Sequence, residues 1–267
     1  MKNIRKFNTT AEMESAVLED VSINYNVETG GVVTVNKPSV IDYSAMYTTF
    51  EALEDGTFSF TKKGTGNDIQ YSNDNGATWS TLRYGKNVSV VTGDKVLWKS
   101  TITPRSVYGI GTFSSSHKFN VSGNIMSLLY GDDFNGQTNL QDKSYSFQNL
   151  FSGCTKIIDA SNLILPATTL ANCCYGDMFF GCTSLTKAPE LPATKLNTCC
   201  YESMFEGCTN LNHITMLATD ISALDCLFNW VKGVSSTGTF VKHPDMTSLP
   251  TGVNGIPNGW TVEDAVL

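Results

Sequence analysis

Short runs of β-forming residues, separated by turn-forming residues, fill the chain from Tyr47 to about Phe119. The runs lie at residues 57–61, 69–72, 79–82, 88–90 and 95–99, and the turn signals at residues 64–68, 73–76 and 92–94. Short strands at this spacing are typical of an antiparallel β-sandwich or a small barrel. We therefore predict a central antiparallel β-sandwich domain over residues 41–123.

The pattern before this domain is different. Thr9 and Glu12 have the spacing of a capping box, which predicts a short helix over about residues 10–18. Two β-forming runs, residues 21–27 and 31–35, flank Glu28-Thr29-Gly30 and predict a hairpin. We assign residues 1–40 to an N-terminal helix-hairpin segment.

Residues 124–267 contain an internal repeat. Its marker is an aromatic residue followed closely by Gly-Cys-Thr, and the three marker cysteines are separated by 28 and then 26 residues. A period of about 20–50 residues indicates a repeat array, whose units bury a core only by stacking on their neighbours. A degenerate copy around Trp230 lacks Gly-Cys-Thr, as terminal repeats often do. The repeat anchors are Gly153 and Cys154, Gly181 and Cys182, and Gly207 and Cys208.

Each repeat is predicted to contain a short helix, a Gly-Cys-Thr turn, a short strand and a proline-marked return. The glycine suits a left-handed position at the end of the helix. Residues 185–188 and 211–214 alternate apolar and polar side chains, as half-buried strands do. The predicted fold class is mainly β with short helices: the N-terminal helix-hairpin segment, the central antiparallel β-sandwich, and a C-terminal leucine-rich-repeat solenoid with a C-terminal cap.

The pattern Phe-x-Gly-Cys-Thr-x-Leu, followed by Leu-Pro-x-Thr-x-Leu, resembles the BspA-like leucine-rich repeats. These repeats occur in bacterial surface proteins and in proteins of phages that infect gut Bacteroidales. The resemblance covers roughly residues 124–262, about half of the chain. Residues 4–29 resemble a segment shared by many virion proteins of these phages, crAss-like phages included. The resemblance implies an adhesive or structural role without identifying a ligand.

All eight cysteines lie inside the repeats. Adjacent Cys-Cys pairs chelate poorly, no Cys-x-x-Cys occurs and the chain has only three histidines, so a zinc site is disfavoured. Because each cysteine recurs at the repeat period, we interpret the thiols as free and packed like small apolar side chains. We predict no catalytic residue, no cofactor-binding residue and no metal ligand.

Trp79 and Trp98 are candidate sugar-stacking platforms, because the phrase around Trp79 resembles hairpins of carbohydrate-binding modules. A core role is favoured for both, since a tryptophan in a strand beside a turn usually packs half-buried. The Asp- and Asn-rich loops, residues 68–75 and 130–134, offer oxygen ligands for calcium. Turn formation is the favoured interpretation there, and ion binding is left open.

Composition narrows the class of partner. A net charge of −7 and an isoelectric point of about 4.9 argue against nucleic acid. No stretch approaches about 18 consecutive apolar residues, so no membrane span is expected. Metalloprotease, serine-hydrolase, P-loop and dinucleotide motifs are absent from the sequence, and we do not expect an enzyme.

We therefore expect a non-enzymatic phage virion protein of head-fibre, decoration or tail-fibre type. Its N-terminal segment would dock on other virion proteins, and its repeats would contact a host-surface glycan or protein. The particle would be assembled in the host cytoplasm, with this chain as a homo-oligomer, a trimer being the first expectation. The alternative is a bacterial cell-surface adhesin or glycan-binding protein of BspA type, against which the lack of a signal-peptide pattern counts.

Overall fold

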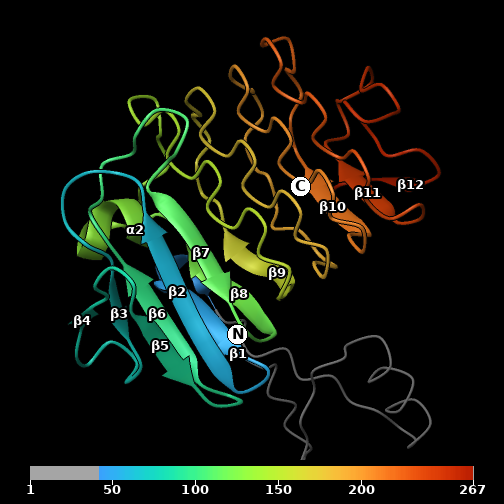
Figure 1. The fold of residues 1–267 in the computed structure, drawn as a ribbon. Helices are drawn as coiled ribbons and strands as arrows, with labels where there is room; N and C mark the ends of the chain where they lie inside the picture. Colours follow the sequence, from blue (N-terminus) through green and yellow to red (C-terminus); the bar gives the residue numbers. More distant parts are fainter. Residues whose placement is uncertain (1–41, 267) are drawn as a thin grey trace, which may run out of the picture. The chain divides into compact units, whose positions relative to one another are not determined.

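The computed structural model describes residues 42–266 (Figure 1). The predicted N-terminal helix and hairpin lie outside the described residues. The chain divides between Asp42 and Tyr43, and residues 43–266 form one compact unit. A 3-10 helix, η1 (Tyr43–Ala45), begins this unit.

Two β-sheets form the first half of the described chain in a sandwich-like arrangement (Figure 1). The three-stranded sheet has the order β5 (Asn87–Val90), β2 (Gly56–Lys62), β7 (Gly111–Ser115). The six-stranded sheet has the order β4 (Ser80–Thr81), β3 (Gln70–Ser72), β6 (Lys95–Lys99), β1 (Thr48–Ala52), β8 (Phe119–Asn124), β9 (Ile157–Ile164). All pairs are antiparallel except β8 with β9, which is parallel.

The two sheets face each other through an aromatic core. Phe50 of β1 is fully buried, and its ring centroid lies 5.3 Å from that of Phe58 and 4.8 Å from that of Phe113. Phe58 and Phe113 belong to the opposite sheet, so these contacts join the two layers. Burying rings of this size supplies much of the hydrophobic stabilisation of such a core.

The helix predicted in each repeat is absent from the described residues, and the predicted fold class is wrong there. The only α-helix described is α2 (Ser127–Tyr130), which is followed by the 3-10 helix η2 (Gly131–Asp133). Where the repeats were expected to be helical, the chain forms consecutive turns. We call these segments coil 1 (residues 145–154), coil 2 (173–182), coil 3 (199–208) and coil 4 (225–234).

A left-handed residue at every fourth position prevents the helix. In coil 2, Cys173 and Asp177 have φ of 52° and Gly181 has φ of 69°. A right-handed helix tolerates no such residue. The same three positions have positive φ in every coil, as shown by Tyr145, Asn149, Gly153; Cys173, Asp177, Gly181; Cys199, Ser203, Gly207; and Asp225, Asn229, Gly233.

Hydrogen bonding explains why this conformation suits stacking. In coil 2 the odd-numbered residues donate their N–H groups to carbonyls of coil 3 or of the segment just before it. The first of these bonds joins Cys173 to Thr198 (3.0 Å), and the last joins Gly181 to Glu206 (2.8 Å). Even-numbered residues donate within the coil, as Gly176 does to Cys173 (3.3 Å). A helix would use every N–H internally, whereas this alternation leaves every second donor for the next coil.

Strands occupy only part of the repeats, and no closed solenoid is evident in residues 42–266. Strands β10 (His213–Met216), β11 (Thr239–Lys242) and β12 (Thr261–Asp264) form a parallel three-stranded sheet. The corresponding strand of the first repeat, β9, pairs with β8 of the sandwich, and single parallel bridges from Asp159 to Lys187 and from Lys187 to His213 link it to β10. The predicted leucine-rich-repeat solenoid is therefore replaced by a stack of turn-built coils, which we call the repeat stack (residues 138–264).

Aromatic rings form a column through the repeat stack. The rings of Phe151 and Phe179 are 5.3 Å apart and inclined by 17°, and those of Phe179 and Phe205 are 5.7 Å apart and inclined by 16°. Phe151 also stacks on Phe113 of the sandwich at 5.7 Å. Sandwich and stack therefore share one continuous hydrophobic core.

Both ends of the coil ladder are covered by other parts of the chain. At the first coil, the Phe113 N–H of β7 donates to the Leu150 carbonyl (2.8 Å). At the last coil, the Val231 N–H donates to the Val253 carbonyl (3.3 Å), and the Trp230 indole N–H donates to the Gly255 carbonyl (2.9 Å). Buried backbone groups need such partners, so the sandwich and the loop after β11 act as caps.

Candidate functional site

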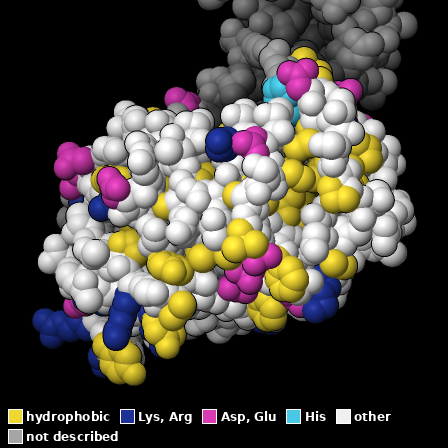
Figure 2. All heavy atoms as spheres, turned by 90° about the horizontal axis from the view of Figure 1, so that it is seen from above, with side chains coloured by type: hydrophobic (Ala, Val, Ile, Leu, Met, Phe, Trp, Pro, Cys, Tyr) yellow, Lys and Arg dark blue, Asp and Glu magenta, His cyan; other side chains and the backbone are white. Residues whose placement is uncertain are grey.

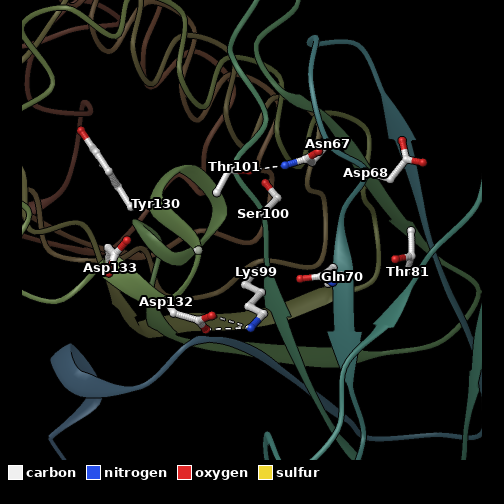
Figure 3. A pocket seen from close by; sticks show the side chains of 11 residues that line it. Asn67, Asp68, Gln70, Thr81, Lys99, Ser100, Thr101, Tyr130, Asp132 and Asp133 are labelled. Carbon is white, nitrogen blue, oxygen red and sulfur yellow. Dashed lines mark hydrogen bonds and ion pairs between the residues drawn. The ribbon is translucent and has the colours of Figure 1, made fainter.

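A polar cavity of about 620 Å³ opens beside β3, β6 and the α2–η2 segment (Figure 3). Its lining comes from four separate stretches of the chain, brought together by the pairing of β3 with both β4 and β6. The lining residues are Asn67, Asp68, Gln70, Thr81, Lys99, Ser100, Thr101, Tyr130, Gly131, Asp132 and Asp133.

The cavity contains a charged pair formed by Lys99 and Asp132. The ammonium Nζ of Lys99 lies 2.7 and 2.9 Å from the two carboxylate oxygens of Asp132, as Figure 3 shows. The Tyr47 hydroxyl donates to the same carboxylate at 2.6 Å. The hydrogen bonds from Lys99 and Tyr47 lower the pKa of Asp132. Burial, reinforced by Asp132, raises the pKa of Tyr47 to about 12.

Other polar groups of the lining differ in whether they already have partners. Asn67 donates its side-chain amide to the Thr101 hydroxyl (3.0 Å), and the Ser100 hydroxyl is bonded to the Leu128 carbonyl. Among the described residues, the side chains of Gln70, Thr81 and Asp133 have no hydrogen-bond partner. These amide, hydroxyl and carboxylate groups are available to a ligand that offers both donors and acceptors.

Trp79 and Trp98 have different environments. Trp98 is fully buried and packs between Phe50 (5.4 Å) and Phe113 (5.1 Å), so its ring is closed to any sugar. Trp79 is half-buried and does not line the cavity, but Lys99 Nζ lies 4.1 Å from its ring centroid and the Tyr47 ring centroid lies 4.8 Å away. One candidate platform thus belongs to the core, and the other supports the lysine of the cavity.

The Asn- and Asp-rich loop after β3 uses its carboxylate within its own turn. Asp74 accepts hydrogen bonds from the Ser72 hydroxyl (2.6 Å) and the Thr78 N–H (2.9 Å). These bonds, that from Ser72 first, lower the pKa of Asp74 to about 2. The geometry is that of a self-bonded Asx turn, and it explains the loop without an ion.

The cysteines of the Gly-Cys-Thr anchors tie neighbouring coils together. The Cys182 thiol donates to the Phe151 carbonyl (3.1 Å), and the Cys208 thiol donates to the Phe179 carbonyl (3.0 Å). All eight cysteines are free thiols in the structure. Burial raises the pKa of Cys154 to about 11 and that of Cys208 to about 12. These anchors are weak candidates for a nucleophile, because a buried thiol ionises poorly.

A second thiol column lies near the surface. Cys173, Cys199 and Glu202 offer two sulfur atoms and a carboxylate oxygen that all lie within 4.8 Å of one another, and all three residues are half-buried. Burial, together with Glu202 and Cys173, raises the pKa of Cys199 to about 12. In residues 42–266 this is the one group of three or more potential metal ligands with such spacing.

This group was not predicted from the sequence. The feature of the sequence that indicates this group is the repeat period. Cys173 and Cys199 are 26 residues apart, so they occupy the same position in consecutive coils. The two cysteines of each adjacent Cys-Cys pair belong to different columns of the stack. Cys174 and Cys200, the partners in those pairs, are fully buried.

Comparisons with protein-family models, with curated proteins and with solved structures find no match for the chain. No helix of the described residues is long and apolar enough to cross a membrane.

Proposed function

We propose that the chain is a non-enzymatic structural protein of a phage particle that presents a binding surface to the host. The observation that carries the proposal is the contrast between constant interior and variable exterior in the repeat stack. The aromatic column and the anchor cysteines are buried. Equivalent positions that are exposed or half-buried hold four different residues, Ser152, Phe180, Glu206 and Lys232, in coils 1 to 4.

This contrast is what a display scaffold requires. Stacked repeats take their stability from contacts between identical neighbours, so the residues that face solvent are free to change with the ligand. Figure 2 shows a face on which hydrophobic side chains lie next to a central group of acidic ones, amid uncharged polar surface. Phe180, Leu224 and Phe228 are 41%, 69% and 45% exposed, and their side chains offer apolar contact area to a partner.

The polar cavity supports a glycan as the host ligand. Its unpartnered amide, hydroxyl and carboxylate groups match the hydroxyl groups of a sugar, which both donate and accept hydrogen bonds. Half-buried Trp79 adds an aromatic edge beside Lys99. The proposed attachment through residues 1–40 rests on the resemblance of residues 4–29 to virion proteins.

Analysis of purified particles tests the virion assignment. Quantitative mass spectrometry of virions is expected to find this chain at a fixed copy number that fits a symmetry axis. Deleting residues 1–40 is expected to leave the remainder folded but absent from particles. Recovery of the chain only in bacterial outer-membrane fractions would instead support a BspA-type adhesin.

Glycan arrays test the ligand. We expect the whole protein to bind a defined set of host-surface glycans, and Gln70→Leu, which removes an unpartnered amide from the cavity, to weaken that binding. The matched control is Tyr108→Ala, which removes a 51% exposed ring outside the cavity lining. Equal loss of binding in both variants, or no binding by the wild type, would contradict a glycan site in the cavity.

A further inference from the structure

We propose that Cys173, Cys199 and Glu202 form a binding site for a thiophilic divalent cation, Zn²⁺, that bridges coils 2 and 3. The three side chains bring two sulfur ligands and one oxygen ligand to one place on the outer side of the stack. The site is independent of the glycan cavity, whose lining lies outside the coils.

Backbone geometry holds the two cysteines together. The Cys173 N–H donates to the Thr198 carbonyl, and the Cys199 N–H donates to the Leu224 carbonyl, both at 3.0 Å. Both cysteines have left-handed backbones, with φ of 52° and 51°. Their side chains therefore leave equivalent coils in the same direction. Glu202 follows Cys199 by three residues, within the same turn.

The spacing suits one tetrahedral ion. Zinc binds thiolate sulfur at about 2.3 Å and carboxylate oxygen at about 2.1 Å, which places two sulfur ligands about 3.8 Å apart. The three ligand atoms already lie within 4.8 Å of one another. Binding therefore needs the ligand atoms to approach one another by at most about 1 Å. Three protein ligands leave the fourth position to water, which half-buried side chains permit.

Charge around the site also favours a cation. Asp177 lies in coil 2 and acts electrostatically on Cys173, as Glu202 does. In residues 42–266 no ion pair neutralises Asp177 or Glu202, whereas Glu206 is paired with Lys232 at 2.8 Å. Two cysteines without a cationic neighbour would form an unfavourable cluster of negative charge as thiolates, which a bound divalent ion offsets.

The remaining thiols do not compete for this role. Cys182 and Cys208 donate to backbone carbonyls inside the core, and Cys174 and Cys200 are fully buried. Soft sulfur ligands favour zinc over calcium and magnesium, which prefer oxygen alone. The outer thiol column, formed by Cys173 and Cys199, is therefore the one suited to bind zinc.

Metal titration of the reduced, whole protein tests the site. We expect one Zn²⁺ per chain by calorimetry after removal of metal by a chelator, and a sulfur-to-metal charge-transfer band when Co²⁺ is used as a probe. Cys173→Ser and Cys199→Ser are each expected to abolish stoichiometric binding and the band. Glu202→Gln is expected to raise the dissociation constant by about tenfold or more.

Two matched variants separate coordination from general damage. Glu206→Gln removes an acidic side chain that is already paired with Lys232, and Cys226→Ser replaces a thiol bonded to the Ile221 carbonyl with a hydroxyl that keeps this bond. Both are expected to bind zinc as the wild type does, and zinc should raise the melting temperature of both. Less than one zinc per chain, binding that survives Cys173→Ser, or a Cys173–Cys199 disulfide in freshly isolated protein would overturn the proposal.

Discussion

The sandwich and the repeat stack bury the same kind of side chain in opposite ways. Around Phe50, neighbouring rings meet at steep angles, 64° with Phe58 and 75° with Phe113. Along the stack, Phe151, Phe179 and Phe205 lie nearly parallel, at 17° and 16°. In the sandwich each ring fits neighbours of different shape and origin, whereas in the stack each ring fits a copy of itself.

The comparison shows two ways of specifying one core. The sandwich depends on pairings between distant segments, such as β1 with β6 and β8. The stack depends on one local arrangement repeated by translation. A substitution that distorts one coil therefore also disturbs the packing of the coils before and after it. Phe151 belongs to both systems, because it contacts Phe50 and Phe113 on one side and Phe179 on the other.

Replacing that shared ring should have the largest effect. Phe151→Ala is expected to cost about 3–5 kcal/mol of unfolding free energy, because it leaves a cavity in a fully buried core. Chemical denaturation followed by tryptophan fluorescence and circular dichroism measures it. Phe180→Ala, at a 41% exposed position of coil 2, should change stability by less than about 0.5 kcal/mol. Two separate unfolding transitions in the wild type would show that the regions are independent.

Glycine substitutions should separate steric crowding from backbone strain. A Cβ on Gly123 of β8 would lie 2.0 Å from the Tyr47 carbonyl oxygen, whereas one on Gly207 would lie 3.5 Å from Gly181 Cα. Both residues have positive φ, 81° and 77°. We expect Gly207→Ala to cost about 1–2 kcal/mol from strain alone, and Gly123→Ala to cost at least twice as much. Equal melting temperatures for the two variants would contradict the close approach of Gly123 to the Tyr47 carbonyl in the sandwich.

The ion pair at the cavity should contribute a smaller, pH-dependent stability. Asp132→Asn is expected to cost about 1 kcal/mol at pH 7, since the carboxylate is 65% exposed and therefore screened. The folded-state pKa of Asp132 is lowered, so its contribution is full above the unfolded-state pKa, near 3.9, and is lost as the pH falls through the folded-state value. The difference between variant and wild type should accordingly shrink below about pH 4.

Asp133 provides the control for this measurement. Its carboxylate is adjacent in sequence but makes no ion pair with any residue of the described range. Asp133→Asn should leave the free energy of unfolding nearly unchanged at both pH values. A pH-independent loss in Asp132→Asn would indicate that packing, rather than charge, explains the effect.

The smallest effect is an expected gain of stability in the stack. Ser203 has φ of 48° and stands in a column whose other members are Asn149, Asp177 and Asn229. Asparagine accepts a left-handed backbone more readily than serine, so Ser203→Asn should raise stability by about 0.5 kcal/mol. Thermal unfolding measures this, with Ser203→Val, a β-branched residue at positive φ, as the destabilising counterpart. A lower melting temperature for Ser203→Asn would contradict the preference for asparagine at this left-handed position.

Local signals in the sequence located five of the eight strands of the first half, β2 to β6, but not β1, β7 or β8. The expected runs at residues 57–61, 88–90 and 95–99 correspond to β2, β5 and β6, because alternation and turn residues are properties of short segments. In the coils the same reasoning failed. Tyr175, Met178 and Cys182 recur at three and four residues, which fits a helix, but successive four-residue turns produce the same spacing. The deciding left-handed residues, Cys173 and Asp177, are not glycines and gave no local signal.

The two sites differ in how far the sequence could have predicted them. The cavity joins residues 67–70, 81, 99–101 and 130–133, and only the strand pairing brings these stretches together. The Cys173, Cys199 and Glu202 group follows from the repeat register alone, once residues 26 positions apart are treated as neighbours. Its identification needed a stacked arrangement, but no detail of the sandwich.

The backbone hydrogen bonds between coils all run one way, and this gives the protein a means of changing its length. Each coil donates to the one that follows and accepts from the one before. A duplicated unit of 26 residues, placed between Cys182 and Cys208, would therefore find an acceptor row on one side and a donor row on the other. Each added unit would lengthen the molecule by about 4.8 Å, the spacing of hydrogen-bonded strands. Unequal recombination between repeats can thus extend or shorten the display surface in whole steps, while both caps stay unchanged.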